Sequence, residues 1–349
     1  MSLPYYYRLS EYVAFVGAVL MNSSLLYLLV TKAGASFGRY RIFMITFCLY
    51  TMVYSFIVVL AQPVIHIEGP SIIFILGGYF KFNKTYGYFL CGLYCGSFAF
   101  CTATFATHFI YRYINVCRFH LLQIFDGWKL WLWYIPPIIL MYIWGAVNVY
   151  VFEINDFKKN YFRKIMNETY EENVDEVVFV APIYFLVDKQ GNRIWQFKDL
   201  GGILILCCIL SFTINVCLVC AYMTYRNLNR LSKMSSKSSA ELNKQLFTAL
   251  ALQTLLPCLT QYIPCSLLYI CPFIGVNAGK FANTLGLYCS IYTVLDPLIA
   301  MLIIERFRKF IFCKYSKVNS KGTLSTEIRI KKNTTNSIVP ESKIEILHI

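Results

Sequence analysis

The chain has 349 residues, of which 58% are hydrophobic and only 14% are charged. Ordinary globular proteins carry about 25% charged residues, so this composition excludes a typical soluble protein and indicates that lipid surrounds much of the chain. The net charge is +14. Because the basic residues lie between long apolar runs, we expect them to meet an anionic membrane leaflet rather than nucleic acid.

Seven apolar runs are long enough to cross a bilayer, which takes about 20 residues. We place these spans at 12–31, 42–63, 86–111, 130–150, 200–224, 245–270 and 281–304. Two shorter apolar pieces, 69–80 and 177–187, are expected to be loop lids on the outer surface. The sequence therefore predicts an all-α membrane protein, with a seven-transmembrane helix bundle within residues 1–315 and a disordered cytoplasmic tail over 316–349.

The distribution of basic residues predicts the orientation of the bundle. With the N-terminus outside, the inner segments hold 21 of the 32 Lys and Arg residues, and seven of the remaining 11 lie in one long outer loop. Long loops cross the membrane largely regardless of charge, so the comparison becomes 21 against 4. We therefore expect the N-terminus outside and the C-terminus in the cytoplasm.

Two glycosylation sequons fall on segments that this orientation places outside. Asn83 and Asn167 each begin an Asn-x-Thr triplet and are candidate glycosylation sites. At the other end, residues 305–315 follow span seven with apolar and basic residues at helical spacing, which predicts a short amphipathic interfacial helix. Cys313 within it is a candidate for palmitoylation, and a plain buried thiol is the alternative.

No enzyme or metal motif is visible. The sequence has no HExxH, no GxSxG and no phosphate loop, and its four histidines are scattered. An internal repeat, typical of transporters, is also lacking. Seven spans with an outer N-terminus favour a G-protein-coupled receptor. A seven-spanning ligand-gated channel or a transporter is the alternative, and the channel class has its N-terminus inside.

Three stretches identify a family. Residues 108–118 read HFIYRYINVCR, residues 242–257 read LNKQLFTALALQTLLP, and residues 296–299 read DPLI. Together they resemble the signatures of nematode serpentine chemoreceptors, closest to the Str type, along nearly the whole chain. This resemblance implies a candidate odorant receptor of the plasma membrane of sensory cilia. The partners that it implies are an odorant, a heterotrimeric G protein and arrestin, with no cofactor.

The chain departs from the resembled receptors in its cysteines. The long outer loop lacks cysteine, so the usual disulfide from the top of span three cannot form. Cys91 must then stay free or find another partner, such as Cys271.

Asp296 is the only formal charge inside the seven predicted runs. A carboxylate at membrane depth costs about 2.5–3.5 kcal/mol on insertion scales, so it needs a partner within the bundle. Pro297 frees the carbonyl of Thr293 and permits a bend. We expect a polar switch formed by Asp296 and Pro297 with Asn22 as the partner, and Pro257 as a second hinge. The alternative is a fixed structural hydrogen bond.

Candidate ligand-binding residues lie in the outer halves of spans three, six and seven, where apolar walls and a few polar groups suit a small, uncharged molecule such as a volatile. The outer halves of these spans contain no acidic residue, so an amine ligand is disfavoured. The candidates are Tyr94, Phe98, Gln261, Tyr262, Asn283 and Tyr288.

Arg112 marks the inner end of span three, and the resemblance implies that it contacts the G protein. Glu241 could pair with Arg112, or it could instead cap the start of helix six. A basic rim around the inner end would attract acidic protein surface, although these charges could serve topology alone. The coupling candidates are Arg112, Tyr113, Arg226, Lys233, Lys237 and Arg306.

Overall fold

The structure, a computed structural model, describes residues 5–34, 37–234 and 237–312. The chain divides into two units, Met1–Ile304 and Glu305–Ile349. The described part of the second unit is the short helix α11 (Glu305–Ile311), in which Lys309 pairs with Glu305 at 2.6 Å. A helix therefore covers the start of the segment predicted to be interfacial, while the last residues of that segment and the predicted tail lie outside the described part.

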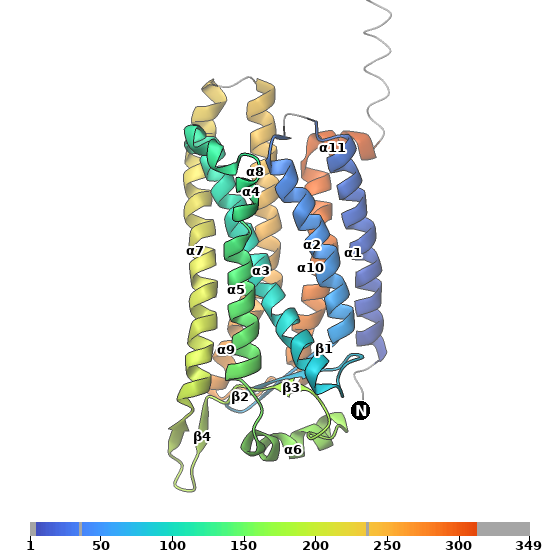
Figure 1. The fold of residues 1–349 in the computed structure, drawn as a ribbon, viewed down its shortest axis with the longest axis vertical. Helices are drawn as coiled ribbons and strands as arrows, with labels where there is room; N and C mark the ends of the chain where they lie inside the picture. Colours follow the sequence, from blue (N-terminus) through green and yellow to red (C-terminus); the bar gives the residue numbers. More distant parts are fainter. Residues whose placement is uncertain (1–4, 35–36, 235–236, 313–349) are drawn as a thin grey trace, which may run out of the picture. The chain divides into compact units, whose positions relative to one another are not determined.

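Within the described residues, seven helices of the first unit are long and apolar enough to span a membrane (Figure 1). Each of the seven predicted spans overlaps one of them. They are Arg8–Thr31, Tyr40–Ala61, Lys84–Cys117, Lys129–Val151, Phe197–Asn227, Ala240–Ile274 and Phe281–Ile303. The corresponding elements are α1 (Tyr5–Thr31), α2 (Tyr40–Ala61), α3 (Lys84–Cys117), α4 (Lys129–Leu132), α5 (Ile135–Ala146), η3 (Val147–Val151), α7 (Phe197–Met234), α8 (Lys237–Pro257), η4 (Cys258–Tyr262), α9 (Ile263–Ile274) and α10 (Thr284–Ile303).

Prolines interrupt spans four and six. The start of span four is the short α4, and α5 then begins with Pro136 and Pro137 in its first turn, where a missing N–H costs no helical bond. In span six, Pro257 ends α8, and the chain continues through the π-helix η4 into α9. Such irregular turns are common where a helix bends.

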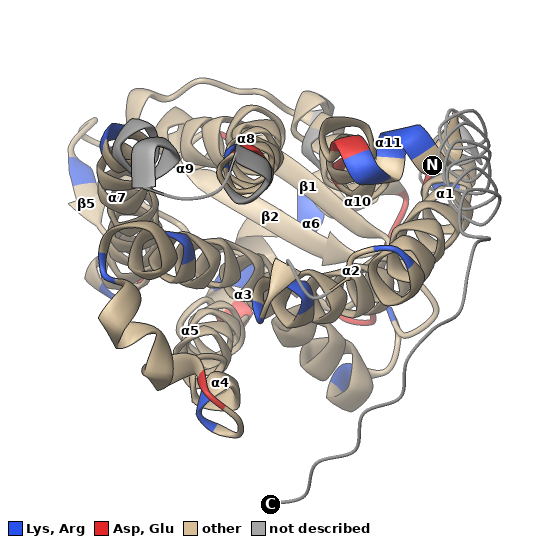
Figure 2. Ribbon diagram, turned by 90° about the horizontal axis from the view of Figure 1, so that it is seen from above, with Lys and Arg blue, Asp and Glu red and all other residues tan. Residues whose placement is uncertain are grey.

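A small antiparallel sheet lies at one end of the bundle, which we call the sheet end (Figures 1 and 2). Its strands are β1 (Pro63–Glu68), β2 (Ser71–Leu76) and β3 (Phe179–Val180), in that order. A separate hairpin joins β4 (Phe185–Val187) to β5 (Arg193–Trp195). The all-α prediction is therefore wrong here. The two short apolar pieces pair with each other, Phe74 opposite Val180, and no local pattern shows a pairing of segments so far apart.

The sheet is buried on both faces, which explains why its strands read as continuous apolar runs. Ile65, Ile72 and Val180 pack into the core of the bundle. The intervening residues face the other way and pack against the amphipathic helix α6 (Asp156–Tyr170), through Phe162 and Met166. The sheet and α6 together form a lid over the sheet end of the bundle, and we use this name below.

A buried ion pair fastens the lid. Lys158 of α6 approaches both carboxylate oxygens of Asp199 at the start of α7, at 3.1 and 2.9 Å, and Asp199 also accepts from the backbone N–H of Ile183 at 2.8 Å. Burial lowers the pKa of Lys158, and the neighbouring carboxylate opposes that shift.

The described cysteines, Cys91 and Cys271 among them, are free thiols. The lid is thus held by strand pairing and charge.

Lys158→Ala should strongly lower the thermal unfolding midpoint of the purified protein. Truncating one partner of a buried ion pair costs about 3–5 kcal/mol, because the other charge stays buried alone. The double variant Lys158→Met, Asp199→Leu should recover part of the loss, since it leaves no buried charge.

The exposed pair Arg163–Asp175, 2.7 Å apart, provides the matched control. Arg163→Ala should change the midpoint little, because exposed ion pairs contribute little to stability. Equal losses in Lys158→Ala and Arg163→Ala would contradict the assigned role of the buried pair.

Candidate functional site

A cavity of about 90 Å³ lies under the sheet, between the ends of the helices. The sheet contributes Ile65, Ile72 and Phe74 to its wall, and the helices contribute aromatic side chains and thiols. Its described lining contains no charged side chain and few polar groups, among them the amide of Asn148. The cavity therefore suits a very small, uncharged ligand.

Three of the predicted ligand-binding residues lie at or beside this cavity. Tyr94 and Phe98 of α3 line it, and Tyr262 packs against Phe98 with ring centroids 5.8 Å apart. The amide oxygen of Asn283 instead accepts from the backbone N–H of Ile65 at 2.7 Å and so holds strand β1.

The other two candidates do not contribute to the described lining. Tyr288 is 46% exposed and absent from the residues that line the cavity. The side chain of Gln261 lies outside the described residues. Tyr288 therefore has no part in the site proposed below.

Sequence reasoning missed the cavity residues of span four and of the lid. Trp144 of α5 and Asn148 of η3 line the cavity, together with Val180 of β3. Span four is apolar on every side, so its sequence carries no signal for the face that turns inward. The strand residues were missed because the sheet itself was not predicted.

Glu11 corrects the expectation that Asp296 is the only charge inside the spans. The first span begins at Arg8, so Glu11 lies within it and is 7% exposed. It lines a narrow space between α1, α2 and α10, together with Ser55 and Ser290, and is not part of the cavity under the sheet.

The partner of Asp296 is Gln253 of α8, and not Asn22 as expected. The Gln253 amide donates to Asp296 Oδ2 at 3.0 Å and to the Asp296 carbonyl at 3.2 Å. Asp296 is 2% exposed. The contact crosses between two helices that each contain a proline close by, Pro257 and Pro297, and it therefore ties together the two predicted hinges.

Asn22 hydrogen-bonds to a different residue of α10 from the one expected. Its amide donates to the carbonyl of Thr293 at 3.1 Å, and to Ala18 at 2.8 Å. Thr293 lies four residues before Pro297, which has no N–H to offer that carbonyl. The side chain of Asn22 thus replaces the helical hydrogen bond that Pro297 removes from α10.

Arg112 lies at the opposite end of the bundle from the sheet and is buried, with 2% exposure. Its guanidinium carbon lies 3.6 Å from the ring centroid of Tyr40, and its Nη1 is 3.5 Å from Asn243 Oδ1. Within the described residues, its Nε and Nη2 have no hydrogen-bond partner. Glu241, the expected partner of Arg112, accepts instead from the side-chain amide of Gln245 at 3.2 Å.

The remaining coupling candidates are dispersed. Tyr113 is half-buried, and Arg226 is exposed beside Tyr222, 5.8 Å from the ring centroid. The side chains of Lys233 and Lys237 lie outside the described residues, and Arg306 belongs to α11. Figure 2 shows Lys and Arg around the ends of α2, α3 and α7.

The structure describes two of the three predicted modification sites. Asn167 is exposed on α6. Asn83 is also exposed, and its side-chain oxygen caps α3 by accepting from the N–H of Tyr86 at 3.1 Å. Cys313 lies outside the described residues.

The arrangement of the seven helices is that of rhodopsin. The crystal structure of squid rhodopsin superimposes with a TM-score of 0.57, covering 97% of this chain and 94% of that one at 11% identity. The fold and the span count define a multi-pass seven-helix membrane protein with a rhodopsin-like bundle.

Sequence comparison then gives the family. A profile described as "Serpentine type 7TM GPCR chemoreceptor Str" matches residues 7–312. The chain is 32% identical to "Serpentine receptor class r-10" of Caenorhabditis briggsae, over 87% of this chain and 88% of that protein. It is 27% identical to "G-protein coupled receptor str-33" of Caenorhabditis elegans, over 84% and 86%. The chain belongs to the Str family of serpentine chemoreceptors, which are G-protein-coupled receptors and not enzymes.

Asn22→Leu should destabilise the protein by about 1–3 kcal/mol, because the buried carbonyl of Thr293 loses its donor. Pro297→Ala restores an N–H for that carbonyl, so we expect it to rescue part of the loss in the double variant. Thermal unfolding of the four purified proteins gives the coupling between the two positions.

Ser24→Ala is the matched control on the same helix, because the exposed hydroxyl of Ser24 donates to the carbonyl of Leu20 within its own helix at 2.8 Å. It should leave the midpoint nearly unchanged. Strictly additive effects of Asn22→Leu and Pro297→Ala would show that Asn22 does not serve the freed carbonyl.

Proposed function

We propose that this Str-family receptor detects a small, uncharged molecule, such as a volatile odorant, in the cavity under the sheet. Binding there activates a heterotrimeric G protein at the opposite end of the bundle. The observation that carries the proposal is the cavity of about 90 Å³, which lies under the lid, has no charged side chain in its described lining and includes Tyr94 and Phe98. The family supplies the general activity, and the cavity supplies the class of ligand.

The proposed orientation places the sheet end outside the cell, in the plasma membrane. The strong excess of Lys and Arg in the segments at the opposite end supports it. Exposed Asn167 on the lid is then available for glycosylation. An antibody against an N-terminal tag should label intact cells, and labelling only after permeabilisation would reverse the orientation.

The cavity lining explains the proposed ligand class. A charged ligand would need a buried counter-charge, and the described residues that line the cavity include none. Glu11, the buried carboxylate nearest this end of α1, lines a separate space. A small molecule with an apolar body and one polar group can use the aromatic walls and the few polar atoms.

Cys265→Phe should weaken the response, because Cys265 lines the cavity and a benzyl group would fill it. An agonist is first identified with a panel of volatiles and a second-messenger assay. We then expect its potency to fall at least about tenfold, equivalent to about 1.4 kcal/mol of binding free energy.

Leu267→Phe provides the control, since Leu267 lies on the same helix and is 55% exposed. It should respond as the wild type does. Unchanged potency in Cys265→Phe, at equal surface expression, would place the ligand elsewhere.

Arg112 is proposed as the residue that meets the G protein after activation. In the described state, it is stacked on Tyr40 and held by Asn243, so it must leave these contacts before it can reach a partner. Cation–π contacts of a desolvated guanidinium contribute about 2 kcal/mol, which is enough to bias the equilibrium between a held and a released arginine.

Arg112→Ala should abolish agonist-driven signalling while surface expression persists. Tyr40→Leu should raise agonist-independent signalling, because it removes the ring on which the guanidinium rests. Arg118→Ala, at an exposed arginine six residues further on, just after the end of α3, should signal normally. Full signalling by Arg112→Ala at matched surface level would remove Arg112 from the coupling site.

A further inference from the structure

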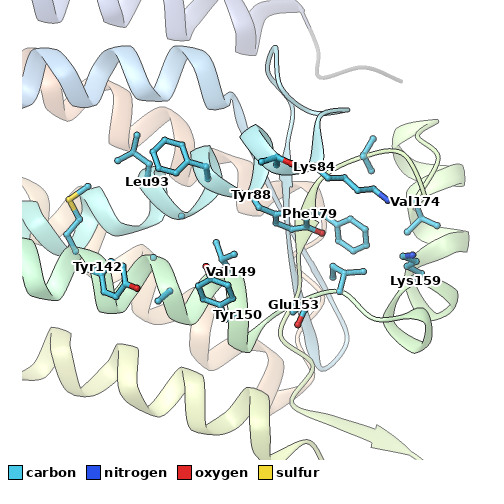
Figure 3. Close-up of a pocket in the computed structure, with 18 of the residues that line it drawn as sticks. Lys84, Tyr88, Leu93, Tyr142, Val149, Tyr150, Glu153, Lys159, Val174 and Phe179 are labelled. Atoms are coloured by element: carbon cyan, nitrogen blue, oxygen red, sulfur yellow. The ribbon is translucent and has the colours of Figure 1, made fainter.

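A groove of about 840 Å³ runs along the outside of the bundle between α3 and α5 (Figure 3). It is much larger than the cavity under the sheet and is separate from it. Leu93 and Met141 lie in its apolar part, and at the sheet end it reaches Phe179 of the lid and Val174, which follows α6. Its size lies in the range of 300–1,000 Å³ that is typical of ligand sites.

Glycines form the bottom of the groove. A Cβ atom at Gly145 would lie 2.7 Å from the carbonyl oxygen of Gly92, and one at Gly96 would lie 2.5 Å from that of Met141. The backbones of α3 and α5 therefore approach each other closely along a line without side chains. Large side chains on either side of this line then become the walls of the groove.

The walls face the bilayer. Phe89, Tyr142 and Tyr150 line the groove and are 70%, 74% and 68% exposed. They belong to spans three and four, so the medium that meets them at this depth is hydrocarbon and not water. An acyl chain is the occupant that such a lengthwise apolar groove accepts.

Charged side chains at the rim of the groove decide which lipid head group fits there. Lys84 is the first residue of span three, and Glu153 follows the end of span four at Val151, so both lie where hydrocarbon gives way to head groups. Neither forms a salt bridge with another described residue. The two other charged residues of the rim already have partners, Lys159 with Asp156 and Asp175 with Arg163. Within the described part, Lys84 and Glu153 are thus the two rim charges without a salt bridge (Figure 3). Asp175 still lies close enough to feel the charge of Lys84, and Lys158 that of Glu153.

We propose that this groove is a binding site for a zwitterionic phospholipid of the surrounding bilayer. The acyl chain lies between α3 and α5. Lys84 contacts the phosphate, and Glu153 contacts the ammonium group of the head. A purely anionic lipid would satisfy Lys84 but would leave Glu153 facing a negative head group, so the pair of opposite charges discriminates between the two lipid classes. This site is independent of the cavity and of the coupling residue proposed above.

Native mass spectrometry of the full-length protein in detergent tests the proposal, with phosphatidylcholine or phosphatidylglycerol of the same chain length added. We expect preferential retention of one phosphatidylcholine. Ala146→Trp should reduce this retention at least about fivefold, because Ala146 lines the groove and an indole would fill it. Lys84→Gln with Glu153→Gln should abolish the preference for phosphatidylcholine.

Controls separate the groove from general effects on the protein. Val219→Trp adds the same indole on α7, at a residue that is 52% exposed and outside the groove, and should retain the lipid. Tyr150→Ser, which removes an exposed wall residue, should weaken retention if Ala146→Trp does not fold. Equal retention by groove and control variants, or preferential retention of phosphatidylglycerol, would overturn the proposal.

Discussion

The hydrocarbon around the spans offers no hydrogen bonds, so every backbone group at that depth must be satisfied within the protein. Pro297 breaks this rule in α10 by leaving the carbonyl of Thr293 without its helical donor, and Asn22 of α1 supplies the replacement. The same constraint explains the neighbouring pair of Asp296 and Gln253, because a lone buried carboxylate would be costly. Helices α1, α8 and α10 are thus joined at the points where their own bonding is incomplete.

The same rule operates at the sheet end, where the chain leaves regular helices. Strand β2 pairs with β1 on one side and with β3 on the other. Asn283 accepts a backbone N–H from β1, and Asp199 accepts one from Ile183, just after β3. The paired backbone can be buried on both faces, so it closes the bundle over the small cavity while it supports α6. A lid fastened in this way needs no disulfide, and the described cysteines are free.

The cavity and two polar contacts lie at three successive levels along the bundle. The cavity lies below the sheet, the contact of Gln253 with Asp296 lies within the spans, and Arg112 lies against Tyr40 at the far end. Between the first two, the thiol of Cys101 lies 3.4 Å from the hydroxyl of Tyr292, one turn before Asp296 on α10. Helix α10 therefore carries residues of both the cavity wall, at Cys289, and the central contact.

The sequence by itself determined the seven spans, because twenty apolar residues in a row have no other stable environment, and its motifs pointed to the right family. It also singled out Asp296, Asn22 and Arg112, since polar groups at membrane depth require an explanation. Only the tertiary structure decided which groups meet: Gln253 with Asp296, Asn22 with Thr293, and residues 69–80 with 177–187 in one sheet. The sequence of an apolar helix does not show which face turns inward, and hydrogen bonds between distant segments leave no local periodicity. The inward faces and these contacts can therefore be seen only in the folded chain.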